Sequence, residues 1–295
     1  MSLLSNNDPT KSEKSSNSTN DIPTIVIRPT RGLKLLDLRE VWRYRELAYF
    51  LINRDLKVRY NQTIIGAAWA ILQPLAMMVI FTLFFGKLAK IPSEGVPYPI
   101  FSYTALLPWQ LFSRIISESS SSILSEARLV TKVYFPRIII PISKAIIALV
   151  DFAISFIILF ILMLIYGISP GIKIIFAPLF IILLLMTSLG ISFWFSTLIL
   201  KYRDLSHVLP FLIQFWLFIT PVIYPTRIIP EKWHILYALN PMTGIIEGFR
   251  WTLLGTGKGL TPMITVSVII AVSLFISGII WFKQKEGTFA DMIGA

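Results

Sequence analysis

The 295-residue sequence contains no cysteine and only two histidines, His207 and His234. The absence of cysteine excludes disulfides, thiolate nucleophiles and thiolate metal sites. Two histidines that lie far apart in the sequence do not make a convincing metal cluster. The sequence therefore points to no metal and no thiol chemistry in this chain.

Charged residues are also scarce, at 15% of the chain, whereas 55% is hydrophobic and the mean hydropathy is +0.72. This is more apolar side chain than one water-soluble domain of this length normally buries, so we expect an all-α integral membrane protein. A net charge of +11 would suggest nucleic acid as the partner of a soluble protein. Here the basic residues flank apolar runs, where they suit anionic lipids. Membrane lipids, and no nucleic acid, are the expected partners.

Six stretches have roughly the 20 mostly apolar residues that a membrane span requires. They cover residues 63–86, 99–117, 143–167, 174–200, 208–224 and 262–282. The second contains Arg114, and the fifth contains Pro210 and Pro221, so these two are the weakest. An even number of spans places both termini on one side. The excess of Lys and Arg on that side predicts that both termini are cytoplasmic.

The segments outside the predicted transmembrane domain, residues 62–284, differ in character. Residues 1–32 are rich in Ser, Asn and Thr and predict a disordered cytoplasmic tail, and residues 285–295 a short cytoplasmic C-terminal tail. Residues 33–61 combine apolar and charged faces with border aromatics, which is typical of an amphipathic helix in the membrane interface. The basic residues where this helix turns into the first span form the predicted membrane anchor: Arg54, Lys57 and Arg59.

Gln73 and Pro74 interrupt the first apolar stretch. Pro74 removes a helix hydrogen bond and predicts a kink. A polar amide facing lipid is unfavourable, so both residues are expected to face protein or a wet cavity. A purely structural kink and a substrate contact both stay open.

Four blocks of sequence occur in a characteristic order: RDLKVRYNQTIIGAAWAILQPL from Arg54, LVTKVYFPR from Leu129, ITPVIYP from Ile219 and LNPMTGIIEGFRWTLLG from Leu239. With these blocks the chain, from Leu33 to its C-terminus, resembles the membrane subunit of type 2 ATP-binding-cassette exporters. It is most similar to the branch that exports lipid-linked polysaccharides such as O-antigen, capsule or teichoic acid. The resemblance implies a homodimer that forms a channel across the bacterial cytoplasmic (inner) membrane, driven by two cytoplasmic ATPase subunits.

The sequence carries no complete nucleotide-binding loop of its own. A Walker A loop requires G-x-x-x-x-G-K-[ST], and the near match around Gly257 and Lys258 has Thr252 and Gly259 at two of the required positions. The chain is therefore not expected to be an enzyme or to bind a cofactor. ATP and Mg²⁺ are assigned to the partner ATPase.

Residues 125–137 form the predicted contact with that ATPase, a coupling loop that begins with Ser125 as a possible helix cap. Tyr134, Phe135 and Pro136 form a stiff apolar anchor, and Phe135 is expected to matter more than Arg128. An ordinary basic cytoplasmic loop is the alternative, which charge alone does not reject. The candidate coupling residues are Glu126, Arg128, Lys132, Tyr134, Phe135 and Arg137.

Residues 225–260 predict an external gate because they are too apolar for a plain loop. Two short re-entrant helices, residues 228–239 and 243–254, are expected on either side of Asn240 and Pro241. Glu247 and Arg250 lie one turn apart and predict a structural ion pair, with contact to an emerging polymer as the second possibility. These four residues are the candidate gate residues.

The candidate channel residues combine the amide of Gln73 with a group of aromatic rings. Rings in a channel could let a polymer slide, because sugar C–H faces pack on aromatic rings. Individually, such rings most often face lipid or the membrane interface. The candidate rings are Phe211, Phe215, Trp216 and Phe218.

Three other functions stay open. A permease of the same type could export a small hydrophobic molecule such as a drug or haem. A secondary transporter would need its own ionisable relay, for which Arg114, Glu118 and Asp151 are available, although Asp151 could instead pair with Lys144. A membrane glycosyltransferase would need paired carboxylates near a loop, and none stands out.

Overall fold

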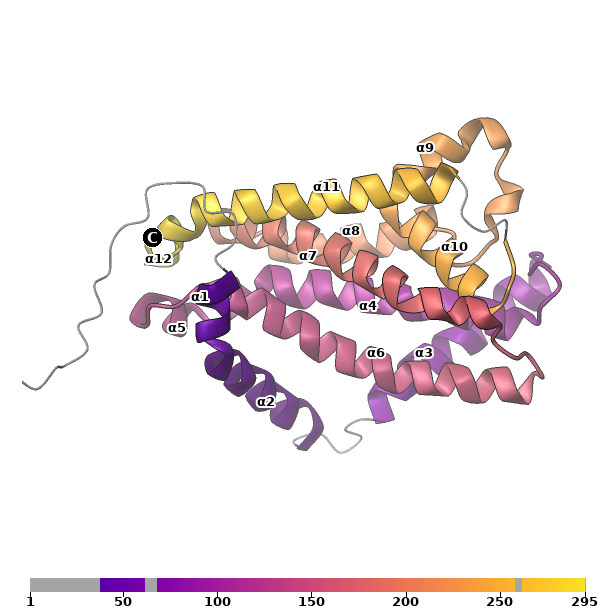
Figure 1. Ribbon diagram of the computed structural model, residues 1–295, viewed down its shortest axis with the longest axis horizontal. Helices are drawn as coiled ribbons and strands as arrows, with labels where there is room; N and C mark the ends of the chain where they lie inside the picture. Colours follow the sequence, from indigo (N-terminus) through magenta and orange to yellow (C-terminus); the bar gives the residue numbers. More distant parts are fainter. Residues whose placement is uncertain (1–37, 62–67, 258–261, 295) are drawn as a thin grey trace, which may run out of the picture. The chain divides into compact units, whose positions relative to one another are not determined.

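The computed structural model describes residues 38–61, 68–257 and 262–294, and all regular elements in these ranges are helical (Figure 1). The predicted tail, residues 1–32, lies outside the described residues, as do residues 33–37. The α-helices are α1 (Leu38–Arg43), α2 (Arg45–Asn61), α3 (Ala68–Phe81), α4 (Tyr98–Ser125), α5 (Ala127–Lys132), α6 (Ile139–Ile165), α7 (Ala177–Lys201), α8 (Leu205–Ile219), α9 (His234–Ala238), α10 (Pro241–Leu253), α11 (Pro262–Lys285) and α12 (Phe289–Gly294).

Short helices of other types extend this framework. A π-helix, Thr82–Leu88, continues α3. The 3₁₀ turns are Ile172–Phe176, Thr226–Ile228, Glu231–Trp233 and Glu286–Thr288. π-Helices are rare and frequently lie at functional sites, so the outer part of α3 is an unusual segment of the bundle.

Among the described residues, four helical segments are long and apolar enough to cross a membrane: Ala68–Leu88, Ile139–Ile165, Ile172–Lys201 and Pro262–Gly294. They correspond to the first, third, fourth and sixth predicted spans. The other two predicted spans are not confirmed by this criterion. Helix α4 is 28 residues long but carries Arg114 and Glu118, and α8 has only 15 residues. Arg114 had already made the second stretch weak in the sequence, and α8 contains Pro210 and ends before Pro221, the two prolines that made the fifth stretch weak.

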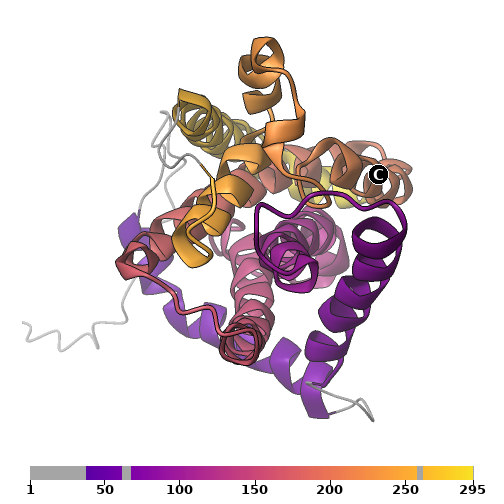
Figure 2. The ribbon, with the colours of Figure 1, turned by 90° about the vertical axis from the view of Figure 1, so that its right-hand side faces the viewer.

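Helix α4 lies at the centre of the helical bundle. It packs against α3, α6, α7, α8 and α10, and the view along the bundle in Figure 2 shows it enclosed by its neighbours. Most of its side chains are buried, including the fully buried Phe101, Tyr103 and Phe112. A helix that is enclosed on most sides can expose polar residues only along the face that remains open.

Helices α7 and α11 form a close backbone contact. A Cβ atom added to Gly278 would lie 2.3 Å from the carbonyl oxygen of Gly190, and one added to Gly190 would lie 2.7 Å from the carbonyl carbon of Leu274. Only glycine allows the two backbones to approach this closely, a device typical of membrane helix pairs.

The amphipathic segment differs from its predicted form. Two helices, α1 and α2, replace the single helix, and the side chain of Leu51 packs into a core with Phe135 and Phe289. Trp42 and Tyr49 are exposed on the outside. The segment thus has one apolar surface that packs against the bundle and a second that faces outward. Only one apolar face was predicted from the sequence, so the two were not distinguished.

The C-terminal segment, residues 285–295, is not an extended tail over its described part. After a 3₁₀ turn it forms α12, which packs against α5 and α7 (Figure 1). Phe289 is fully buried and its ring contacts that of Phe282 edge to face. The C-terminus therefore belongs to the same packed end of the bundle as α5.

Helices occur in both stretches predicted as gate helices, with altered bounds, and their re-entrant course stays a prediction. Helix α10 begins at Pro241, two residues before the predicted start, and the side chain of Asn240 accepts a hydrogen bond from Met242 N and caps it. The first helix is shorter than predicted, because residues 228–239 form only a 3₁₀ turn and the five-residue α9. Pro230 precedes this 3₁₀ turn and cannot donate a backbone hydrogen bond, which explains the break.

Candidate functional site

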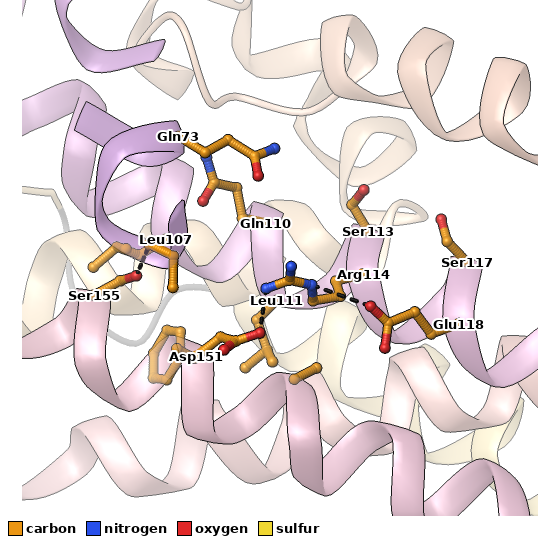
Figure 3. Close-up of a pocket in the computed structure, with 13 residues that line it drawn as sticks. Gln73, Leu107, Gln110, Leu111, Ser113, Arg114, Ser117, Glu118, Asp151 and Ser155 are labelled. Carbon is orange, nitrogen blue, oxygen red and sulfur yellow. Dashed lines mark hydrogen bonds and ion pairs between the residues drawn. The ribbon is translucent and has the colours of Figure 1, made fainter. Parts of the chain in front are cut away.

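A polar cavity of about 270 Å³ lies between α3, α4 and α6 (Figure 3). Helix α3 contributes Gln73, an exposed side chain at the cavity wall, and its expected substrate contact stays a prediction. Apolar side chains such as Leu111 and Phe152 complete the wall. The polar residues that line the cavity are Gln73, Gln110, Ser113, Arg114, Ser117, Glu118, Asp151 and Ser155.

Most of these polar residues come from one face of α4. Gln110, Ser113, Arg114, Ser117 and Glu118 follow the three- and four-residue spacing of a single helical stripe. A polar row facing lipid would be unfavourable, so the stripe must face protein or water. Arg114 stands out in the sequence as an exception in an apolar span, but the stripe was not predicted, although its helical period can be read from the sequence.

A charge network closes one side of the cavity around Asp151. The Asp151 carboxylate, 5% exposed, accepts a hydrogen bond from Arg59 Nη1 at 3.0 Å. It also accepts hydrogen bonds from the guanidinium of Arg114 and the hydroxyl of Tyr60. Buried carboxylates require such partners, and here they come from α2 and α4.

Glu118 completes the network by joining the same two arginines. Arg59 Nη2 donates to Glu118 Oε1 at 2.5 Å, and Arg114 Nε lies 3.3 Å from that oxygen. Two guanidinium groups thus alternate with the carboxylates of Glu118 and Asp151, so the network carries no net charge. Burial and the hydrogen bond to Asp151 raise the pKa of Tyr60 to about 12, so this tyrosine stays a proton donor.

The predicted pair between Asp151 and Lys144 is wrong. Lys144 Nζ instead donates to Asp55 Oδ2 at 2.5 Å. Seven residues along a helix separate two positions by about 10.5 Å, which is beyond direct contact for these side chains without bending back along the helix. Helix α2 supplies nearer partners to both residues.

Helix α2 is fixed to the bundle by the residues predicted as the membrane anchor. Arg54 binds Asp55 and, through two nitrogens, Glu126 at the end of α4. Arg59 binds Glu118 and Asp151, whereas Lys57 is exposed. Two of the three anchor residues therefore hold helices together, which the sequence analysis did not foresee.

Four polar groups on the cavity wall have no hydrogen-bond partner within residues 38–61, 68–257 and 262–294. They are the amides of Gln73 and Gln110 and the hydroxyls of Ser113 and Ser117. Figure 3 shows these side chains along the same open side, above the Arg114 guanidinium. Unpaired donors and acceptors on the wall of this cavity are available to water or to a polar ligand.

The predicted coupling residues separate into buried and exposed groups. The expected cap is wrong: Ser125 ends α4 and Glu126 precedes α5 without a side-chain cap bond. Glu126 binds Arg54, and Arg137 binds Glu286. Phe135, the expected contact anchor, is 3% exposed.

The remaining coupling candidates form a surface. Tyr134 is 64% exposed, and Arg128 and Lys132 on α5 are exposed as well. We call Arg128, Lys132 and Tyr134 the α5 surface. It combines two positive charges with one aromatic ring beside a buried anchor.

The four predicted channel rings lie on two sides of α8, although Phe215 and Trp216 both line an apolar pocket between α4, α7 and α8. Phe211, Phe215 and Phe218 are exposed on one face of the helix. Trp216 faces inward, contacts the ring of Phe112 edge to face, and donates from Nε1 to Asn240 Oδ1 at 3.1 Å. Trp216 therefore joins α8 to the start of α10.

The predicted ion pair between Glu247 and Arg250 is confirmed, with Nη1 and Oε1 3.4 Å apart. Arg250 is fully buried and also donates to the carbonyl oxygens of Val222 at 3.0 Å and Tyr224 at 3.3 Å. Its guanidinium lies 3.8 Å from the ring centre of Phe101. Arg250 thus holds the segment after α8, helix α10 and helix α4 at one point.

The family model described as ABC-2 type transporter matches residues 46–254, which include the cavity, the α5 surface and α10. The chain belongs to the ABC-2 type transporter family. With its four apolar helical segments, this ABC-2 protein is a multi-pass membrane protein.

The ABC-2 protein aligns with curated relatives over nearly the whole length of each relative. The O-antigen export system permease protein RfbA of Myxococcus xanthus is 29% identical over 263 residues, 87% of this chain and 98% of the relative. A protein of the same name from Klebsiella pneumoniae is 28% identical over 249 residues, 84% of this chain and 95% of the relative. The polysialic acid transport protein KpsM of Escherichia coli is 24% identical over 257 residues, with coverage of 84% and 95%.

Proposed function

We propose that this ABC-2 protein is the channel-forming permease subunit of an ATP-driven exporter that moves a lipid-linked polysaccharide of the O-antigen or capsule type across the bacterial cytoplasmic membrane. The likeness to O-antigen and polysialic acid permeases along more than four fifths of the chain carries the proposal. The polar cavity supports it, because hydroxyl-rich cargo suits a wall of amides and hydroxyls. The chain also has an apolar pocket of about 380 Å³ between α4, α7 and α8, which would suit a small hydrophobic molecule, so the likeness to polysaccharide permeases decides between the two functions.

The proposed topology has six spans, with α4 and α8 added to the four apolar segments and both termini in the cytoplasm. The open polar face of α4 supports a homodimer. The side chains of Arg114 and Glu118 are 30% and 29% exposed, which is unfavourable against lipid. A second copy that faces this side would enclose a shared, hydrated pathway.

In this proposal two separate ATPase subunits supply ATP hydrolysis and bind at the α5 surface. Rigid attachment favours this role, because Phe135, Val130 and Leu51 hold α5 in a buried core. Work is transmitted only through contacts that differ between nucleotide states. A surface fixed to α2, α4 and α12 would pass such differences on to the bundle.

Deletion of the gene tests the proposed function. We expect loss of one cell-surface polysaccharide and accumulation of the same lipid-linked glycan inside the cell, restored by a plasmid copy. The measurement is gel analysis of surface glycan beside analysis of cytoplasmic lipid-linked glycan. Unchanged glycan on both sides of the membrane in the deletion strain would refute the proposal.

The α5 surface makes a second prediction, which revises the expected role of Phe135. Tyr134→Ala removes an exposed ring, so it should weaken co-purification with the ATPase by about tenfold or more, equivalent to about 1.4–2 kcal/mol, while the melting temperature stays unchanged. Phe135→Ala opens a cavity in the core and should destabilise the protein by about 3–5 kcal/mol. Co-purification and thermal melting of both variants distinguish the roles.

Arg128→Ala is the matched control for this prediction, because rim charges contribute little to affinity. Normal association of Tyr134→Ala would remove the ring from the contact. A Phe135→Ala variant with unchanged stability but lost association would restore the original expectation.

A further inference from the structure

Several polar groups on the wall of the cavity between α3, α4 and α6 form no hydrogen bond to other described residues of the chain. Gln73, Gln110, Ser113 and Ser117 have no partner in the described ranges, whereas the neighbouring ionised groups are paired with one another. Ligand sites usually present a few polar groups that converge on one space. Polar groups at membrane depth in transporters mark substrate pathways.

The charges of the cavity restrict the ligand. Arg59 and Arg114 are paired with Glu118 and Asp151, so among the described residues of the cavity no cation is left over for an anionic group. A ligand with its own charge would lose hydration without gaining a counter-ion. Groups that donate and accept at once, such as hydroxyls, fit both the amides and the free lone pairs of the carboxylates.

The size of the cavity restricts the ligand further. About 270 Å³ falls just below the range of roughly 300–1,000 Å³ that holds drug-sized ligands. The space suits one small ring with several hydroxyl groups. Phe152 and Leu111 supply apolar wall for the C–H face of such a ring.

We propose that this cavity is a binding subsite for one uncharged sugar residue, held by Gln73 and Gln110 and by the Asp151–Arg114–Glu118 network. The inference rests on the proposed function, and it adds a position at which a passing glycan pauses. Binding is weak, because a polymer that must leave requires no tight site. Arg59 connects the subsite to α2, so movement of α2 changes the sugar's carboxylate partners.

The test uses the absence of cysteine from the chain. Ser113→Cys places a single thiol on the cavity wall of the permease, close in size to the native side chain. Membrane vesicles that contain the complete permease–ATPase complex are treated with a charged, water-soluble maleimide, and labelling of the permease is followed with time. Ile157→Cys, at an exposed apolar position of α6, is the control that faces away from the cavity.

The expected result is labelling at position 113 but not at 157, with slower labelling in the presence of neutral maltohexaose. For a Kd of about 1 mM, about 10 mM maltohexaose should slow labelling by about tenfold. Hexagalacturonate, which carries a carboxylate on each sugar, should not slow it. Adding Gln110→Ala to Ser113→Cys should remove the protection and leave labelling without sugar unchanged.

Four results would overturn the proposal. They are no labelling at position 113, no protection by maltohexaose, equal protection by hexagalacturonate, and protection that survives Gln110→Ala. The deletion experiment separates the two proposals: if the surface polysaccharide depends on the gene but maltohexaose gives no protection, the subsite is wrong and the export function stands. If the polysaccharide does not depend on the gene, the function itself fails.

Discussion

Asp151→Leu is expected to destabilise the protein by about 3–5 kcal/mol, because it leaves Arg59 and Arg114 close together with only Glu118 to balance them. Helix α2 would lose one of its two ion-pair attachments to α6, keeping only the pair between Asp55 and Lys144, and polysaccharide export should fail. The measurements are the melting temperature of the purified permease–ATPase complex and the amount of surface glycan. Asp151→Asn, which keeps the shape and loses the charge, should give a smaller loss.

A double variant tests whether charge balance is the cause. Arg114→Gln combined with Asp151→Asn leaves one guanidinium, Arg59, with one carboxylate, Glu118, and should recover at least half of the stability lost in Asp151→Asn. Asp204→Asn, an exposed carboxylate before α8, is the matched control and should melt like the native protein. Native stability of Asp151→Leu, or a double variant weaker than Asp151→Asn, would contradict this account.

Arg250→Ala should have an effect of similar size at the other end of the bundle. It leaves the buried Glu247 carboxylate without its ion pair, and the carbonyls of Val222 and Tyr224 without this donor. Unpaired buried groups of this kind give a loss of about 3–5 kcal/mol. Arg250→Lys should rescue little, since one ammonium group cannot replace the planar fork that reaches all three partners. Thermal melting and surface glycan report both effects.

Arg227→Ala is the control for this position, because Arg227 is exposed in the same region. Combining Arg250→Met with Glu247→Gln removes both charges and should recover part of the stability lost in Arg250→Ala. Melting of Arg250→Ala at the native temperature would show that the partners of Arg250 are satisfied without it. Full rescue by Arg250→Lys would show that charge alone, and not geometry, holds α10.

Local patterns predicted the features that depend on neighbouring residues. Glu247 and Arg250 lie three residues apart on one helix, so their pairing follows from helix geometry. Asn240 and Pro241 were interpreted as a break between two helices, and the predicted start at residue 243 missed that an asparagine cap followed by proline is itself a local helix-start signal. The apolar segments and the membrane family could be recognised from composition and from the order of the sequence blocks.

Long-range contacts account for the errors. Asp151 meets Arg114 and Arg59, which precede it by 37 and 92 residues, so its partners depend on how α2, α4 and α6 pack. The burial of Phe135 depends on Leu51 and Phe289, which no local pattern relates to it. The polar stripe of α4 is different. Its helical period is visible in the sequence, whereas the cavity that it lines depends on the packing of α3 and α6 and could not be predicted.

The contact between Gly190 and Gly278 limits how an export cycle can proceed. Two backbones in direct contact have no side chains between them that could change rotamer, so α7 and α11 cannot slide past one another without separating. They would move as one rigid unit through every nucleotide state. The opening of a pathway would then fall to α2, α3 and α8, which pack mainly against α4 and α6 and little against α7 and α11. A thiol crosslink between α7 and α11 would then leave transport intact, whereas one between α2 and α6 would arrest it.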